Sequence, residues 1–258
     1  MQDKDAMVLI KAENIVKKFG GITALNKVNF TVYKDEIVGL VGDNGAGKST
    51  LIKILSGVYL PEEGEIFFKG KKIFFKNPRQ AREIGIETVY QDLALAPNMD
   101  VSMNMFAGRE LVSFDLKILK VLDKRKMVQE ATHTLKDVLG ITISSDAMGL
   151  PVLNLSGGQQ QAVAIGRAIY SQPKLLIMDE PIAAISVKER GKVLGLMKKL
   201  KERGISIIFI SHNLDEILSV VDRIVILNRG CLVRDVKRQD TCLEEVVTAM
   251  LAGESRNN

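Results

Sequence analysis

The feature that most constrains the fold is a short apolar run that leads directly into a glycine-rich loop. Residues 37–41 read Ile-Val-Gly-Leu-Val, and the loop that follows consists of Gly42, Asp43, Asn44, Gly45, Ala46, Gly47, Lys48, Ser49 and Thr50. The apolar run is typical of a strand covered on both faces, and the helical pattern after the loop completes half of a β-α-β unit. The sequence therefore predicts an α/β domain built on a parallel sheet.

The loop matches the phosphate-binding pattern G-x-x-x-x-G-K-[ST] at every fixed position. Glycines let successive amide groups converge on phosphate oxygens, and the positive end of the next helix faces them. We expect all nine residues to contact a nucleotide, with Lys48 at the β and γ phosphates and Ser49 as a Mg²⁺ ligand. By itself this loop fits kinases, GTPases and motors equally.

Two acids follow a second buried-type strand. Residues 175–178 are apolar, and Asp179, Glu180 and Pro181 come directly after them. Chain direction in a parallel sheet brings Asp179 to the same edge as the phosphate loop. Asp179 is therefore a candidate for the Mg²⁺ shell, and Glu180 is a candidate general base for the attacking water. The alternative is that these acids cap the next element.

Further patterns outline the rest of the chain. We expect strands at 7–12, 28–32, 205–210 and 224–227, a hairpin of 66–69 with 72–75, and helices at 124–139, 187–203, 214–221 and 243–251. Strand signals fade from about residue 92 to residue 154, which predicts an inserted helical segment.

Composition excludes several classes of protein. The 258 residues are 46% hydrophobic and 26% charged, as in globular domains, and the net charge of +5 is spread along the chain, so nucleic acid is not an expected partner. Cys231 and Cys242 form no disulfide framework and no metal-ligand spacing with His133 and His212, which favours a reducing cytoplasm. No signal-peptide pattern or membrane-spanning run is present, so any membrane partner is expected to be another chain.

A third motif consists of Leu155, Ser156, Gly157, Gly158 and Gln159, which open a helical pattern. Serine at a helix start followed by glycines favours an anion site, although alone it is equally typical of a plain turn. Together with the phosphate loop upstream and the acid-tipped strand downstream, this motif resembles the signature of the ATP-binding-cassette family. The resemblance extends from about residue 10 to residue 251.

The resemblance implies one ATPase domain over residues 1–258. Its fold would be a P-loop NTPase (RecA-like) α/β core with an N-terminal antiparallel β subdomain, from residues 1–91 and 158–258. An inserted helical subdomain would occupy 92–157, with the signature motif at its end. In that family an aromatic at the position of Phe19 stacks on adenine, a glutamine at Gln91 links the active site and its Mg²⁺ to the membrane partner, and a histidine at His212 contacts the γ-phosphate. His133 is expected on the surface.

The resemblance also implies that each ATP lies between the phosphate loop of one copy and residues 156–159 of a second copy. The expected cofactors are ATP and Mg²⁺, and the expected partners are a second copy, membrane permease subunits and, indirectly, an extracytoplasmic sugar-binding protein. The expected location is the cytoplasmic face of the cell membrane. Residues 92–106 would receive the permease, with Met99, Met103 and Met105 either at that surface or in the core.

The stretch 70–108 is similar to bacterial importers of ribose, xylose and fructose, so we predict an ATPase subunit that powers sugar uptake. The family commonly has an aspartate at the position of Ser186, which puts its usual coupling between two copies in doubt. The alternatives are an importer of amino acids or other solutes, or a cassette ATPase in DNA maintenance or translation. No sustained heptads, Cys-x-x-Cys pair or tandem repeat supports the last two.

Overall fold

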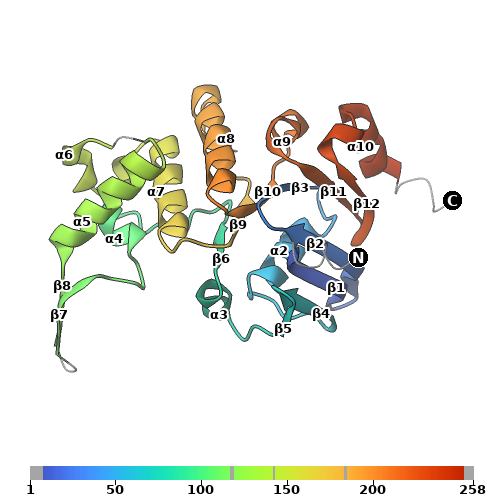
Figure 1. Cartoon of the computed structure of the whole chain (residues 1–258), viewed down its shortest axis with the longest axis horizontal. Helices are drawn as coiled ribbons and strands as arrows, with labels where there is room; N and C mark the ends of the chain where they lie inside the picture. Colours follow the sequence, from blue (N-terminus) through green and yellow to red (C-terminus); the bar gives the residue numbers. More distant parts are fainter. Residues whose placement is uncertain (1–7, 117–118, 142, 183–184, 253–258) are drawn as a thin grey trace.

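The computed structural model describes residues 8–116, 119–141, 143–182 and 185–252 (Figure 1). A six-stranded sheet forms the centre, in the order β12-β11-β3-β10-β9-β6. Its strands are β3 (Ile37–Val41), β6 (Ile86–Val89), β9 (Leu175–Asp179), β10 (Ser206–Ile210), β11 (Arg223–Asn228) and β12 (Cys231–Lys237). The first five are parallel to one another and β12 is antiparallel to β11. The predicted parallel α/β sheet is confirmed, whereas Met7, Ala183, Ala184 and the end 253–258 lie outside the described residues.

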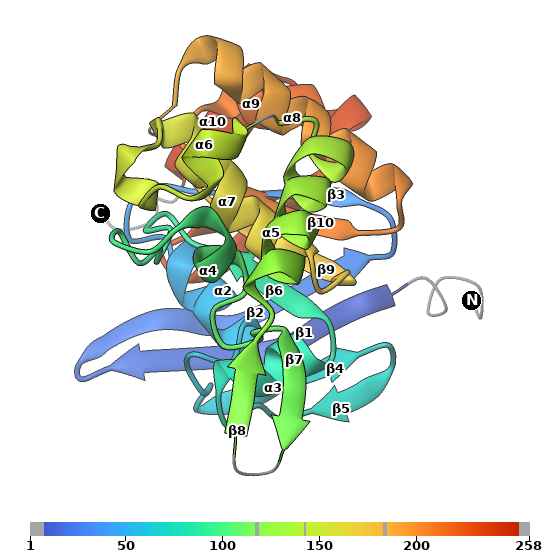
Figure 2. The same ribbon diagram turned by 90° about the vertical axis from the view of Figure 1, so that its left-hand side faces the viewer.

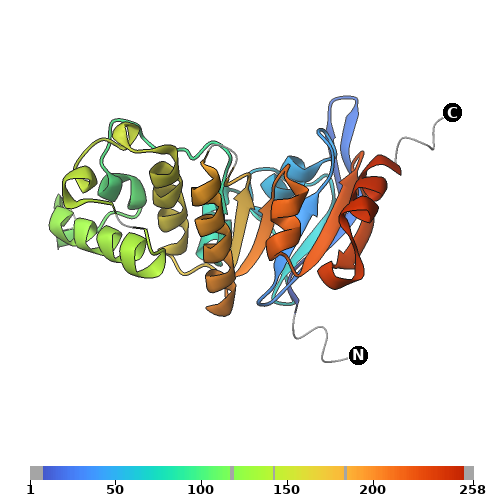
Figure 3. The ribbon, with the colours of Figure 1, turned by 90° about the horizontal axis from the view of Figure 1, so that it is seen from above.

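Side chains of β3 alternate between two hydrophobic cores. Val38 and Leu40 pack with helix α2 (Lys48–Leu55) and with the N-terminal antiparallel sheet. Ile37 and Val41 pack on the other face with helices α7 (Gly157–Ile169), α8 (Val187–Glu202), α9 (Leu214–Val220) and α10 (Leu243–Leu251). Burial on both faces explains why this strand contains no polar residue. The helices α8, α9 and α10 run along one face of the sheet in Figure 3.

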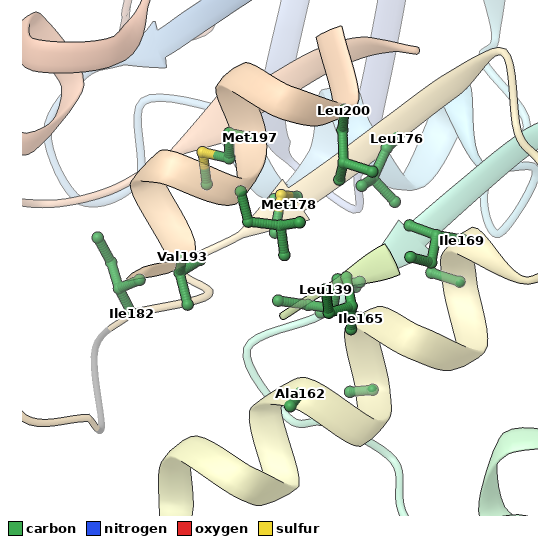
Figure 4. Packing of buried hydrophobic residues seen from close by; sticks show 14 of the residues in the cluster. Leu139, Ala162, Ile165, Ile169, Leu176, Met178, Ile182, Val193, Met197 and Leu200 are labelled. Atoms are coloured by element: carbon green, nitrogen blue, oxygen red, sulfur yellow. The ribbon is translucent and has the colours of Figure 1, made fainter. Parts of the chain in front are cut away.

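Figure 4 shows the core where α7 and α8 meet the sheet. Leu200 of α8 lies beside Leu176 of β9, and Ile169 of α7 lies near both. These side chains are all at most 5% exposed. The helix that begins with the signature motif is therefore packed directly on the strand that carries the acids.

The N-terminal sheet is antiparallel, in the order β2-β1-β4-β5. Its strands are β1 (Val8–Phe19), β2 (Ile22–Tyr33), β4 (Glu63–Phe68) and β5 (Lys71–Ile73). The strand expected at 28–32 is longer than predicted. The expected hairpin is present, but it turns at Lys69 and Gly70, one residue earlier than the predicted turn at Gly70 and Lys71. The φ angles of Lys69 and Gly70, 50° and 75°, suit the tight turn between twisted strands.

The inserted part is less uniformly helical than expected. It contains α4 (Val101–Met105), α5 (Lys124–His133), a π-helical turn (Thr134–Val138), α6 (Ser145–Met148) and a 3-10 turn (Val152–Asn154). The single helix expected at 124–139 therefore changes to π-helical geometry at Thr134. A hairpin of β7 (Val112–Leu116) and β8 (Leu119–Leu122) projects from it, as Figure 2 shows. The sequence did not predict these two short strands, which form a two-stranded sheet with each other.

Two short helices complete the chain, α3 (Pro78–Glu83) before β6 and a 3-10 turn (Arg238–Asp240) before α10. Asn77 caps α3 by accepting a hydrogen bond from the backbone of Gln80. In the part of the chain that the structure describes, no helix combines the length and apolar character needed to cross a membrane.

A buried guanidinium connects the two sheets. Arg223, at the start of β11, donates to both oxygens of Glu36 over 2.7 and 3.2 Å, and to the backbone oxygen of Thr31 in β2 over 2.5 Å. It also binds Asp235 of β12 with two bonds of 2.7 Å. The Arg223 side chain is 10% exposed, so removing it leaves the Glu36 carboxylate buried without its cation.

We expect Arg223→Ala to lower the free energy of unfolding by about 3 kcal/mol, because an uncompensated buried charge remains. Arg234→Ala is the matched control, since Arg234 pairs with Glu245 on the surface over 3.1 Å. That change should cost less than about 1 kcal/mol. Urea unfolding measures both values, and equal losses would contradict a structural role for the buried network.

Candidate nucleotide-binding site

The phosphate loop is packed against main chain on two sides. A Cβ atom on Gly42 would lie 2.3 Å from the backbone oxygen of Leu227 in β11. A Cβ atom on Gly47, whose φ is 104°, would lie 2.7 Å from the oxygen of Ala24 in β2. The loop is also joined to the β11–β12 turn by a 3.0 Å hydrogen bond from Gly230 N to Ala46 O. Only glycine fits such close approaches.

Lys48 begins α2 directly after the loop, and its side chain turns back over the loop. Its ammonium group donates to the backbone oxygens of Gly42 and Asp43 over 2.7 and 3.0 Å. Burial lowers the pKa of the Lys48 ammonium, while the carboxylates of Glu180, Asp179 and Asp43 oppose that shift. The Lys48 ammonium group is therefore fixed by the loop, and Lys48 lines the same cleft as the loop residues that would bind phosphates.

The two acids at the end of β9 have different surroundings. Burial, followed by the charge of Glu180, raises the pKa of the Asp179 carboxyl, and the Lys48 cation opposes this. Glu180 has a left-handed backbone, with φ of 52°, and its amide donates to Ile210 O in the next strand over 3.0 Å. Such a conformation is strained for a residue with a Cβ. Its Oε1 lies 2.5 Å from His212 Nε2.

These groups share one cleft of about 370 Å³. The predicted residues that line it are Asn44, Gly45, Ala46, Gly47, Lys48, Ser49, Thr50, Gln91, Asp179, Glu180 and His212. Gly42 is buried beneath the loop, and Asp43 lines a neighbouring hollow with Asn228 and Arg229. Residues separated by up to 168 positions in the chain thus meet at the carboxyl ends of four parallel strands, β3, β6, β9 and β10.

Phe19 does not line this cleft. Its ring is 43% exposed and packs edge-on against Tyr59, with the ring centroids 5.3 Å apart. The Lys17 ammonium lies 5.3 Å from the Phe19 ring centroid and also pairs with Glu62 over 2.7 Å. The neighbouring hairpin residues of β2 do reach the cleft. An adenine-stacking role for Phe19 stays a prediction, and no sequence pattern singled out Tyr59.

The signature motif also lies away from the cleft of its own chain. Ser156 caps α7 by accepting from the amide of Gln159, whose side chain accepts from the Ser156 amide. This reciprocal capping leaves Gly157 and Gly158 at the start of the helix. A Cβ atom on Gly158 would lie 2.2 Å from an oxygen of Glu189, so a larger residue here would displace the Glu189 side chain of α8.

Ser186, where the family commonly has aspartate, is the N-cap of α8. Its hydroxyl lies 2.9 Å from Glu189 Oε2, and the Ser186 amide donates to the same oxygen over 3.2 Å. Ser186 therefore has a local structural role as a helix cap, which was not part of the role at the interface between two copies that the resemblance implied. Because the Glu189 carboxylate also lies against Gly158, the start of α8 lies close to the start of α7.

The segment after Gln91 is held by the helix that carries the signature. Arg167 of α7 donates to the backbone oxygens of Leu93 and Ala94 over 2.7 and 2.9 Å. No sequence pattern singled out Arg167 for this role. Of the methionines expected near this segment, Met105 is fully buried and Met99 is 46% exposed. His133 is exposed as predicted and pairs with Asp137 over 2.6 Å.

The donor set fits Mg²⁺ together with a polyphosphate. The Ser49 hydroxyl, the Asp179 carboxylate and the Gln91 amide bring oxygen atoms to one cleft. Mg²⁺ usually takes one or two carboxylates and completes its shell with substrate phosphates and water.

Comparison with known proteins identifies the family. The sequence profile described as ABC transporter matches residues 25–183, which is more than half of the chain. The chain belongs to the ABC transporter family. It is 45% identical to the xylose/arabinose import ATP-binding protein of Sulfolobus acidocaldarius, over 94% of this chain and 93% of that protein. It is 41% identical to the fructose import ATP-binding protein of Rhizobium meliloti, with the same coverage.

Longer relatives and solved structures agree with the ABC assignment. The chain is 36% identical to a ribose import ATP-binding protein of Caldanaerobacter subterraneus but spans only 49% of that protein. A nucleotide-free ATP-binding cassette of an ABC transporter has a TM-score of 0.81 at 29% identity, covering 94% of this chain and 98% of that one. A bacterial ABC transporter cassette described as dimeric has a TM-score of 0.75 at 27% identity, covering 89% and 99%. The predicted family and fold are therefore confirmed.

In this ABC chain, Gly42→Ala should lower the affinity for a fluorescent ATP analogue at least about tenfold, because the added methyl collides with Leu227 and displaces the loop. Gly70→Ala is the control. Its φ is also positive, at 75°, but no atom lies within 4 Å of the added Cβ. The control should lose only about 1 kcal/mol of stability and retain binding. Equal affinities in the two variants would refute the close-packed loop.

Proposed function

We propose that this chain is the ATP-hydrolysing subunit of an ABC importer that takes up a sugar, most simply a monosaccharide. The observation that carries the proposal is the convergence of the phosphate loop, Asp179, Glu180 and His212 on one cleft in a chain of this family. Relatives at 36 to 45% identity that are named as import proteins for xylose or arabinose, fructose and ribose support the sugar class.

Each group of residues in the cleft has a different role in ATP hydrolysis. Amide groups of the loop and the Lys48 cation bind and orient the β and γ phosphates. Ser49, Asp179 and Gln91 would hold Mg²⁺, which would supply positive charge to the phosphates. Glu180 accepts a proton from the attacking water, and His212, 2.5 Å from Glu180, holds that carboxylate in place and contacts the γ-phosphate.

The site of one chain is completed by a second copy. Ser156 and the start of α7 do not line the cleft of their own chain, which supports a role toward the ATP of a partner copy. Donors at this helix start would hold the γ-phosphate before hydrolysis and lose it afterwards, so that the two copies separate. Each copy would include a nucleotide-binding core from residues 1–91 and 158–258 and a permease-facing insertion from 92–157.

The remaining partners are membrane permease subunits, with a sugar-binding protein acting through them. We place the chain at the cytoplasmic face of the membrane, attached through the segment after Gln91. That segment is anchored by Arg167, so movement of the permease there would be transmitted to the signature helix. Import of an amino acid or another solute is the alternative that the cleft itself permits equally.

Glu180→Gln should retain ATP binding and lower the rate of hydrolysis at least about a hundredfold, because the amide cannot accept a proton from water. With ATP and Mg²⁺ the variant should accumulate as a dimer in size-exclusion chromatography. Glu245→Gln makes the same chemical change far from the cleft and should behave like wild type. Normal turnover by the Glu180 variant would remove it as the general base.

ATP hydrolysis by the intact complex with its permease and binding protein should rise severalfold with one monosaccharide from a panel of xylose, arabinose, ribose and fructose. Amino acids should give no stimulation. The Glu180→Gln complex is the control for contaminating ATPases. Stimulation by an amino acid and by none of the sugars would overturn the sugar assignment while leaving the ATPase intact.

A further inference from the structure

Glu216 lies outside the cleft, in the first turn of α9, and its side chain is only 13% exposed. The two oxygens of its carboxylate have different partners. Arg190 Nη1 of α8 donates to Oε1 over 3.0 Å, and Ser211 Oγ donates to Oε2 over 3.1 Å. One carboxylate therefore joins helix α8 to the loop that follows β10.

In the loop after β10, the Ser211 hydroxyl makes hydrogen bonds that connect the backbone on the two sides of His212. The amide of Asn213 donates to Ser211 Oγ over 3.1 Å, so the hydroxyl links the residues before and after the histidine. The His212 side chain is 59% exposed, and Glu180 is its ion-pair partner. Because little packing holds the imidazole, its place at Glu180 depends on the backbone that Ser211 and Glu216 fix.

On the side of α8, Arg190 holds the segment that precedes its own helix. Arg190 Nε donates to the backbone oxygen of Ile185 over 3.1 Å. Ile185 is next to Ser186, the position that the family resemblance places at the contact between two copies. Through Arg190 and Ser211, Glu216 thus connects a segment that would face the partner copy with the loop that contains His212.

The chemistry of this bridge requires a carboxylate. Arg190 and Ser211 are both donors, so the group between them must accept on both oxygens. A glutamine could accept from Ser211 but would turn its own NH₂ group toward Arg190. The partly buried bond to the guanidinium is charge-assisted, and such bonds fix geometry more strongly than neutral ones.

We propose that Glu216 is a positioning residue for ATP hydrolysis that couples residues 185 and 186 to His212. The inference rests on the proposed function and deepens it. When a second copy docks against Ser186, Arg190 transmits the shift of that segment to Glu216, and Ser211 transmits it to the loop of His212. Glu216 itself does not line the cleft, so ATP binding to the single chain is independent of it.

The first test compares Glu216→Gln and Glu216→Ala with Asp215→Asn, which changes the neighbouring exposed acid of the same helix. In both Glu216 variants kcat should fall roughly tenfold or more, because His212 is misplaced. The Kd for a fluorescent ATP analogue should stay within about twofold of wild type, because the phosphate loop and Lys48 are left unchanged. Wild-type kcat in Glu216→Ala would overturn the proposal.

A double-mutant cycle separates coupling from loss of fold. Arg190→Ala and Ser211→Ala should each lower kcat, and neither should lower it further when combined with Glu216→Ala. Independent addition of their effects would overturn the proposal, as would a loss of kcat that only follows the fraction of folded protein measured by circular dichroism. A wild-type complex that does not hydrolyse ATP would instead refute the proposed function.

Discussion

The direct contact of the phosphate loop with the main chain of other strands is the constraint on which the site depends. Gly42 approaches Leu227 of β11 and Gly47 approaches Ala24 of β2 so closely that neither position has room for a side chain. The loop is therefore held from behind by the parallel sheet and from the side by the antiparallel sheet. Lys48 then ties the loop to itself through two carbonyl oxygens. The geometry of the phosphate loop is therefore set mainly by contacts of its backbone before any nucleotide binds.

The parts of the molecule that could be predicted from sequence are those encoded by neighbouring residues. The buried-type strand at residues 37–41, its loop and the acids after residue 178 each occupy a continuous stretch. The rule that ligands bind at the carboxyl ends of parallel strands was then enough to bring Lys48, Asp179 and Glu180 together. The family, the fold and the ATPase function were predicted correctly for this reason. The individual roles of Phe19, Gln91, His212 and the signature residues stay predictions, as do the boundaries of the subdomains.

What sequence reasoning missed depends on contacts between distant segments. The carboxylate of Glu216 meets Arg190 across two helices, and Arg223 meets Glu36 from the opposite end of the chain. A lone charged residue on an amphipathic pattern looks like any solvated surface residue, so no local signal distinguishes it. The hairpin at 112–122 was missed for a different reason. Its strands are only five and four residues long, and they pair with each other.

The position of β3 in the sheet has a consequence for the order of events during synthesis. This strand carries the phosphate loop, yet its hydrogen-bonded neighbours are β10 and β11, and Ile37 pairs with Ile207. At a translation rate of about 5 to 20 residues per second, the ribosome needs roughly 10 to 35 seconds to supply that partner. The loop cannot acquire its final support until most of the chain has emerged. An incomplete chain thus carries an intact phosphate-loop sequence without the framework that would let it engage cellular ATP.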